Sequence, residues 1–216
     1  RELAAANENL AQLPKEPEGF QLDESWTPYR QWITPSQLRF CGILHEYEIS
    51  RKETEASGNQ LLQNMAIRKR DQDISALLAS SRVGEDGFRS WVSIVESVFA
   101  TEALNPKTGL TELAAGVILK TPCGNTLGTG RVMDEEGGST AEFKYLAFEG
   151  DLIFTQLASV RRGDPVLFDG TFARSEQRSG ERYVTNSAGK REKIEAYSKP
   201  KDAPDMFVNI SYLAKL

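Results

Sequence analysis

Cys41, His45 and Glu48 are the residues whose types and spacing come nearest to a chemical site. Cys41 and His45 stand four residues apart in a segment with helical periodicity, and Glu48 follows a further turn along. A thiolate and an imidazole on one helix face can bind zinc or act as nucleophile and base. Zinc needs further nitrogen or sulfur ligands, and His45 is the single histidine. The residues therefore predict a packed helix face with a polar tip rather than a metal site or a catalytic pair.

Cys41 and Cys123 are the two cysteines of the chain. Free cysteine commonly behaves as a small core residue, which favours two buried free thiols. A single disulfide, formed in an oxidising compartment, is the alternative.

Three further motifs have ordinary structural explanations. Residues 123–130, CGNTLGTG, match neither nucleotide-binding fingerprint and predict a turn between strands. Asp134, Glu135 and Glu136 adjoin two glycines and indicate a solvated loop, not the opposed acids of a hydrolase. Residues 162–164 spell Arg-Gly-Asp, which also suits the end of a helix and the start of a strand. We therefore expect a protein that is not an enzyme, with no catalytic residue, metal ligand or cofactor.

A locally basic stretch is the best candidate for binding a charged ligand. Residues 161–201 carry ten basic and six acidic side chains, although the whole chain has a net charge of −5. That overall charge argues against broad, sequence-blind binding of nucleic acid. Basic loops beside aromatic strand faces can still hold a single strand. The candidate ligand-binding or nucleic-acid-binding residues are Phe143, Tyr145, Arg161, Arg162, Arg174 and Arg182.

The first 35 residues combine a short helical pattern with a strap rich in proline and aromatic residues. Four prolines between positions 14 and 35 exclude a long helix there. The strap is expected to pack on the rest of the molecule. Its aromatic residues are taken as exposed and as candidate protein contacts, because aromatic residues are enriched at such anchors; they are Trp26, Tyr29 and Trp32.

Two further segments follow the strap. Residues 36–87 have helical periodicity with a polar interruption near Gly58-Asn59, so they form a helix hairpin or one long helix. Residues 88–216 change to short β-type runs at 91–99, 116–121, 143–148, 165–172 and 206–213, with a helical interruption at 151–160. The prediction is an α+β protein in which a helical segment precedes a five-stranded β-barrel with one short helix.

The stretch LASVRRGDPVLFDGTF, residues 157–172, resembles the corner between the helix and the fourth strand of OB-fold domains. Val166, Phe168 and Phe172 alternate along one face of its strand, with Gly170 among them. The pattern from Trp91 to the final strand is similar to a group of uncharacterised bacterial proteins, often membrane-anchored. The resemblance implies an OB-like barrel and a place at the cell envelope, and it implies no catalytic residue.

The bulk properties bound the remaining choices. The 216 residues, 39% of them hydrophobic, are enough for a sizeable core, and no apolar run reaches the roughly 18 residues of a membrane span. The chain opens at Arg1 and not at methionine, so we expect that a segment preceded it. The sequence favours a non-enzymatic binding or assembly module whose partner is a protein. A single-strand nucleic-acid-binding protein is the alternative, and nothing in the sequence predicts the oligomeric state.

Overall fold

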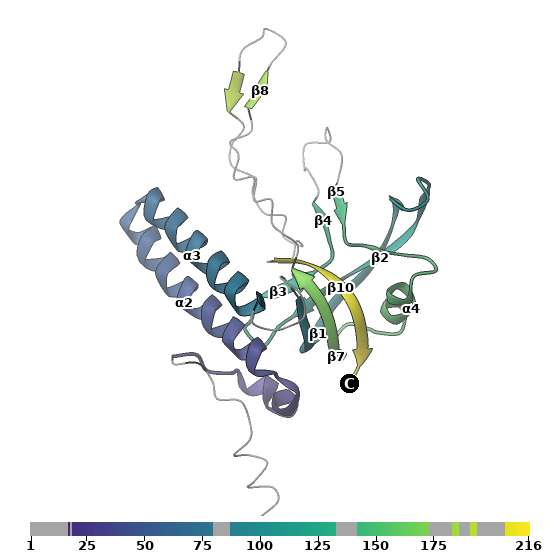
Figure 1. Ribbon diagram of the computed structural model, residues 1–216, viewed down its shortest axis with the longest axis horizontal. Helices are drawn as coiled ribbons and strands as arrows, with labels where there is room; N and C mark the ends of the chain where they lie inside the picture. The colour runs from purple at the N-terminus through teal and green to yellow at the C-terminus, as the bar shows by residue number, and fades with distance from the viewer. Residues whose placement is uncertain are drawn as a thin grey trace, which may run out of the picture.

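The computed structural model describes residues 17, 19–79, 87–132, 142–172, 183–185, 191–193 and 206–216. They form a mixed α+β fold in which a helical hairpin lies to one side of a curved sheet (Figure 1). The helices of this part are η1 (Glu24–Trp32), α2 (Pro35–Ser57), α3 (Gln60–Ala79) and α4 (Leu152–Ala158). Its strands are β1 (Gly87–Leu104), β2 (Thr111–Lys120), β3 (Thr126–Gly128), β4 (Gly130–Val132), β5 (Glu142–Lys144), β6 (Ala147–Phe148), β7 (Pro165–Phe172), β8 (Tyr183–Thr185), β9 (Arg191–Lys193) and β10 (Met206–Lys215).

Helices α2 and α3 form a hairpin, not one long helix. The Thr34 side chain caps α2 by accepting a hydrogen bond from the Gln37 amide, and Pro35 occupies the first turn. Gly58 ends the helix in the left-handed conformation, at φ 64°. The Asn59 side chain then accepts from the Leu61 amide at the start of α3. The Gly-Asn pair therefore separates the two helices.

Five strands of the sheet pair in a closed ring. β1 pairs antiparallel with both β2 and β7, and β7 pairs antiparallel with β10. β3 closes the ring, because it lies antiparallel to β2 and parallel to β10. The sixth strand of this sheet, β6, adds to β2 outside the ring, and α4 follows it. The helix predicted at 151–160 is therefore present.

The third strand of the ring differs from the prediction. Residues 126–128, expected to be part of a turn, form β3, and the Leu127 side chain is fully buried. The tight turn is confined to the preceding residues, where the Thr121 amide donates to the Asn125 carbonyl at 2.9 Å. The run at 143–148, expected to be a single strand, is divided between β5 and β6. Tyr145 interrupts it, since a φ of 66° cannot continue an extended strand.

The hairpin and the ring share one core. The ring of Phe40 in α2 contacts that of Trp91 in β1, with centroids 5.0 Å apart. Trp91 in turn stacks on Phe88, with ring centroids 4.4 Å apart. Phe168 and Phe172 of β7 complete this aromatic cluster. Large aromatic side chains contribute most of the buried area in such cores. Burial of the cluster therefore couples the base of the hairpin to β1 and β7.

Gln37 joins α2 to β1 through a pair of hydrogen bonds. Its side chain is fully buried; Nε2 donates to the Val92 carbonyl at 2.7 Å, and Oε1 accepts from the Val92 amide at 3.1 Å. The amide group thereby satisfies both backbone groups of Val92, as a neighbouring strand would. The Trp91 indole nitrogen adds a hydrogen bond to the Ser36 hydroxyl at 3.1 Å.

A disulfide is the third connection between the hairpin and the ring. Cys41 of α2 is bonded to Cys123, in the turn between β2 and β3, with the two Cα atoms 4.9 Å apart. The expectation of two free buried thiols is therefore wrong. The two residues are 82 positions apart in sequence, and their proximity follows from the packing of α2 on that turn.

The strap folds onto the outer face of β1. Its 3₁₀ helix η1 contains Pro28 and buries Trp26, which is 2% exposed, against Ile33, Leu38 and Val92. Val92 thus faces the strap while the neighbouring Trp91 faces the main core. Both faces of this half of β1 are consequently covered.

Candidate binding surfaces

The strap offers two of its three predicted contact residues to solvent. Trp26 is buried, so the expectation that it is exposed is wrong; its ring packs edge to face on Tyr29, with centroids 6.1 Å apart. Tyr29 is half-buried, and Trp32 is 37% exposed. Trp26 therefore anchors the strap, while Trp32 and the edge of Tyr29 remain accessible.

The predicted nucleic-acid-binding residues are spread over the chain. Arg174 and Arg182 lie outside the described residues, and Phe143 lies in β5, of which the backbone is described. Tyr145 is 36% exposed, between β5 and β6. Arg161 and Arg162 are exposed in the turn before β7. Within the described part of the chain, no contact joins Tyr145 to either arginine.

The Arg-Gly-Asp turn is held to β1 by its backbone and by Asp164. The Gly163 amide donates to the Val95 carbonyl at 2.8 Å, with Gly163 at φ 89°, and the Val95 amide donates to the Asp164 carbonyl at 2.9 Å. The Asp164 carboxylate accepts from the Lys215 ammonium at 2.7 Å and from the Arg161 amide at 2.9 Å. These two bonds, the first above all, lower the pKa of Asp164.

The positive charge of Arg161 makes a small further contribution to the lowered pKa of Asp164. Neither guanidinium has a hydrogen-bond or ion-pair partner among the residues that the structure describes. Gly163 and Asp164 are explained by the turn, whereas Arg161 and Arg162 remain exposed and available to a ligand.

Exposed aliphatic side chains gather at two places that the sequence analysis missed. One is the tip of the helical hairpin, with Leu61, Leu62 and Met65 between 41% and 67% exposed. The other is the end of β1 and β2, where Leu104, Leu110 and Leu113 are between 44% and 67% exposed. The first group falls in the helical segment predicted at 36–87, and the second lies between the strand-like runs predicted at 91–99 and 116–121. Clustered exposed apolar residues are typical of interaction surfaces.

The β1–β2 end is ordered despite its exposed leucines. The Asn105 side-chain amide and the Thr108 hydroxyl both donate to the Glu112 carboxylate, at 2.7 Å and 2.5 Å. These bonds, led by that of Thr108, lower the pKa of Glu112. The Lys107 ammonium lies 2.8 Å from the Asp151 carboxylate before α4, which ties the β1–β2 turn to the base of the ring and lowers the pKa of Asp151.

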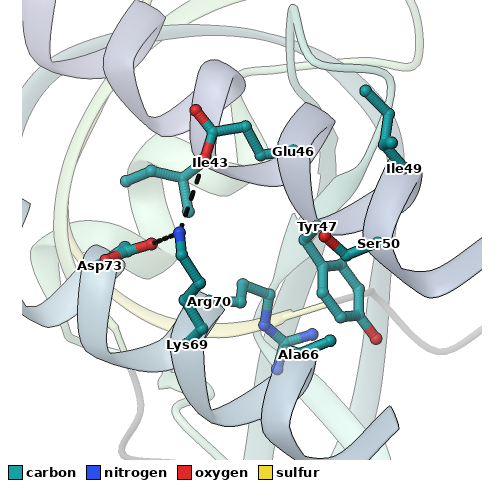
Figure 2. Close-up of a pocket in the computed structure, with 9 residues that line it drawn as sticks. All are labelled: Ile43, Glu46, Tyr47, Ile49, Ser50, Ala66, Lys69, Arg70 and Asp73. Carbon is teal, nitrogen blue, oxygen red and sulfur yellow. Dashed lines mark hydrogen bonds and ion pairs between the residues drawn. The ribbon is translucent and has the colours of Figure 1, made fainter. Parts of the chain in front are cut away.

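The helical hairpin has a shallow pocket of about 250 Å³ between α2 and α3 (Figure 2). The Lys69 ammonium lies 2.7 Å from the Asp73 carboxylate and 3.6 Å from that of Glu46. The Arg70 guanidinium lies 4.6 Å from the centre of the Tyr47 ring. The Arg70 guanidinium also pairs at 2.7 Å with the Asp71 carboxylate, which lies outside the pocket. All four charged side chains of the pocket therefore have partners of opposite charge.

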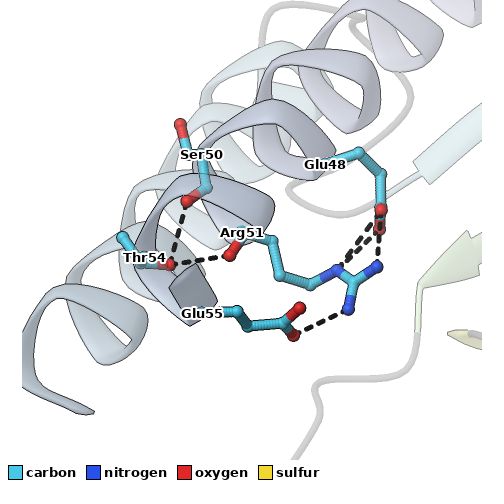
Figure 3. Close-up of polar contacts among 5 residues, drawn as sticks. All are labelled: Glu48, Ser50, Arg51, Thr54 and Glu55. Carbon is cyan, nitrogen blue, oxygen red and sulfur yellow. Dashed lines mark hydrogen bonds and ion pairs between the residues drawn. The ribbon is translucent and has the colours of Figure 1, made fainter. Parts of the chain in front are cut away.

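The Cys41, His45 and Glu48 set does not form a chemical site. The Cys41 sulfur is bonded to Cys123, and the His45 ring packs edge to face against Phe20, with centroids 6.2 Å apart. The Glu48 carboxylate pairs at 2.9 Å with Arg51, whose pKa it raises together with Glu55 (Figure 3). In the described ranges, no group of three or more metal-ligating side chains is placed to hold a metal ion.

Comparisons with known proteins give no further guide to function. No family model matches the chain, and no curated protein or solved structure matches it.

Among the helices that the structure describes, none has the length and apolar character of a membrane span.

Proposed function

We propose that the ring of strands is an OB-like barrel and that the protein is a non-enzymatic binding module. The ring order, β1–β2–β3–β10–β7, supports the first part, and along the sequence α4 lies between β3 and β7, the third and fourth strands of the ring to occur in the chain. The parallel pairing of β3 with β10, the last strand in the sequence, closes it. Two small antiparallel pairs, β4–β5 and β8–β9, lie outside the ring sheet.

The partner of this module is a protein. The observation that carries this proposal is the pair of exposed aliphatic groups, one on the hairpin tip and one on the β1–β2 end. A disulfide, the Gln37 hydrogen bonds and the aromatic cluster hold the hairpin on the ring. A rigid frame lowers the entropic cost of presenting two contact surfaces at once.

The disulfide also supports a location in an oxidising compartment. Disulfides form and persist in oxidising environments such as the bacterial envelope, and are rare in the cytosol of ordinary bacteria. We therefore place the module at the cell envelope, in keeping with the resemblance noted in its sequence.

In-cell photo-crosslinking tests the proposal. A benzophenone amino acid replaces Leu61 or, separately, Leu104, and the exposed helical residue Gln72 serves as the control position. We expect a defined protein adduct from positions 61 and 104 that is absent at 72. The purified partner should bind the Leu61→Asp/Met65→Asp variant at least about tenfold more weakly than wild type. Equal adducts at all three positions, or equal affinities, would refute a protein-binding role for these surfaces.

Single-stranded nucleic acid is the second candidate ligand. The OB-like ring order favours it, and so do the exposed Tyr145 and the exposed Arg161 and Arg162, which have no ion-pair partner among the described residues. Anisotropy of a labelled oligonucleotide, titrated at two salt concentrations, tests it. Salt-sensitive micromolar binding would support this function, and the absence of binding at low salt would exclude it.

A further inference from the structure

Among the residues that the structure describes, the second half of β1 has one hydrogen-bonding edge without a partner strand. Up to Val95, β1 is paired on one side with β7 and with the turn that precedes it. From Ser97 to Leu104 its only partner among the described strands is β2. The strand therefore leaves the ring with one edge paired and the other open.

The hydrogen bonds of β2 show which backbone groups face the open edge. The Val117 carbonyl accepts from the Thr129 amide, and its amide donates to the Thr129 hydroxyl, so both groups point toward β3. Val98, which is directly opposite Val117, must therefore point its own amide and carbonyl away from β2. Strand periodicity extends this orientation to every second residue, namely Ala100, Glu102 and Leu104.

The side chains beside this edge are mainly apolar. Val98, Ala100 and Leu104 are exposed along one face. The exposed Glu102 is the one charged member of this row, and it lies opposite Leu113 of β2, which is 44% exposed. An added strand would set alternate side chains against this row, and its backbone would complete the ladder. Exposed strand edges of this kind are normally blocked by proline, by bulges or by covering elements. The bulge in β1 lies between Val95 and Ser97, so residues 98–104 keep a regular register with β2 and nothing of this kind blocks their edge.

Two positive charges stand at the start of the open edge. The Arg-Gly-Asp turn is hydrogen-bonded to Val95, so Arg161 and Arg162 adjoin the point where the edge opens. Both side chains are exposed and unpaired among the described residues. An incoming strand that carried an acidic residue or a free carboxylate at this end would neutralise them.

We propose that the open edge of β1, Ser97 to Leu104, binds an extended peptide of another protein by strand addition. The peptide has apolar residues at alternating positions and an acidic group that meets Arg161 and Arg162. This inference rests on the proposed protein-binding function and specifies one of its two surfaces.

Selection from a random peptide library displayed on phage tests the inference. The purified disulfide-bonded protein is the bait, and Ala100→Pro is the matched variant. Proline removes an amide that faces the open edge, so it blocks strand addition without removing a β1–β2 hydrogen bond. We expect enriched peptides that alternate apolar residues and end in an acid. Their affinity should fall about tenfold or more on Ala100→Pro, which should retain the wild-type circular dichroism spectrum.

Two further measurements keep the inference falsifiable if Ala100→Pro does not fold. Methylation of alternate backbone amides in the best peptide should abolish its binding to the wild type. The Arg161→Glu/Arg162→Glu variant should reverse the preference from an acidic to a basic end. The inference is overturned if no peptide is enriched, if N-methylated peptides bind equally well, or if the charge reversal changes nothing.

A second copy of the chain could also bind at the open edge of β1, and the purified wild-type and Ala100→Pro proteins can reveal this. Light scattering that shows a wild-type dimer and a monomeric Ala100→Pro variant would assign the edge to self-association and overturn the peptide proposal. Failure at the edge is separable from failure of the proposed function, because crosslinks from position 61 report the hairpin tip alone.

Discussion

The two halves of β1 belong to the same strand and have opposite surroundings. From Gly87 to Val95 one edge of the strand is paired with β7 and with the turn before it. The Gln37 side chain and the first pairs with β2 occupy the other edge, and the strap and the aromatic core cover Val92 and Trp91 on opposite faces. From Ser97 to Leu104 one edge is open, and the side chains of Val98, Ala100 and Leu104 are exposed. The contrast indicates that the buried side chains of the first half contribute much more to stability than the exposed side chains of the second half, which can change without loss of the fold.

Truncation of one large side chain in each half is the strongest test of this contrast. Trp91→Ala should lower the free energy of unfolding by about 3–5 kcal/mol, because the indole is fully buried in the aromatic cluster. Leu104→Ala should change it by no more than about 0.5 kcal/mol, since that side chain is 67% exposed. Urea unfolding followed by tryptophan fluorescence or circular dichroism measures both. Comparable losses in the two variants would contradict the division.

The disulfide should have the next largest effect. Cys41→Ala/Cys123→Ala should lower the free energy of unfolding by about 2–5 kcal/mol. The two cysteines are 82 residues apart, so removal of the bond greatly increases the conformational entropy of the unfolded chain. Thiol titration of the unfolded wild type, without and with reductant, should find no free thiol and then two. A reactive thiol in the unreduced protein would show that the bond is absent in solution.

The loss of the Gln37 hydrogen bonds to Val92 should have the third largest effect on stability. Gln37→Leu leaves the buried amide and carbonyl of Val92 without partners, which should cost about 2–4 kcal/mol. Gln72→Leu, at an exposed position of α3, is the matched control and should change the free energy of unfolding by less than about 0.5 kcal/mol. Chemical denaturation of the two variants side by side decides whether the hydrogen-bonded pair matters.

The smallest expected effect concerns Asp164 at the boundary between the two halves. Its folded-state pKa is lowered from the ordinary 3.8, chiefly by the Lys215 ammonium. The ionised carboxylate therefore stabilises the fold above the unfolded-state pKa, and this contribution is lost as the pH falls through the lowered folded-state pKa.

Asp164→Asn should consequently melt at a lower temperature than wild type at pH 7. The difference should begin to shrink as the pH approaches 3.8 and should vanish below the lowered folded-state pKa. Thermal melts across this pH range measure it. A gap between wild type and variant that widens toward low pH would contradict the assignment.

Local chemistry made part of the fold predictable. Gly58 and Asn59 marked the break between α2 and α3, since a left-handed residue and an amide cap are readable from residue type. The alternation of Val166 and Phe168 placed both side chains on one face, and both are fully buried. Gly170 was correctly set among the inward positions. Glycine is needed there because the backbone of β10 lies very close: a Cβ would be 2.6 Å from the Asn209 carbonyl oxygen.

The remaining features depend on contacts between distant segments. The approach of Cys41 to Cys123 follows from how α2 packs, which residue spacing does not encode. Trp26 and Trp32 have the same residue type in the same strap, yet only tertiary packing decides that the first is buried. The edge of β1 is likewise a property of pairing, because an open and a paired edge have the same alternation of side chains.

The disulfide also makes the chain topologically closed. Cys41 and Cys123 enclose α3, β1 and β2 in one covalent loop. A single peptide-bond cleavage anywhere within that loop leaves both fragments attached, so a nicked molecule migrates as one species until reductant is added. The protein would thereby survive such a cut as one covalent unit.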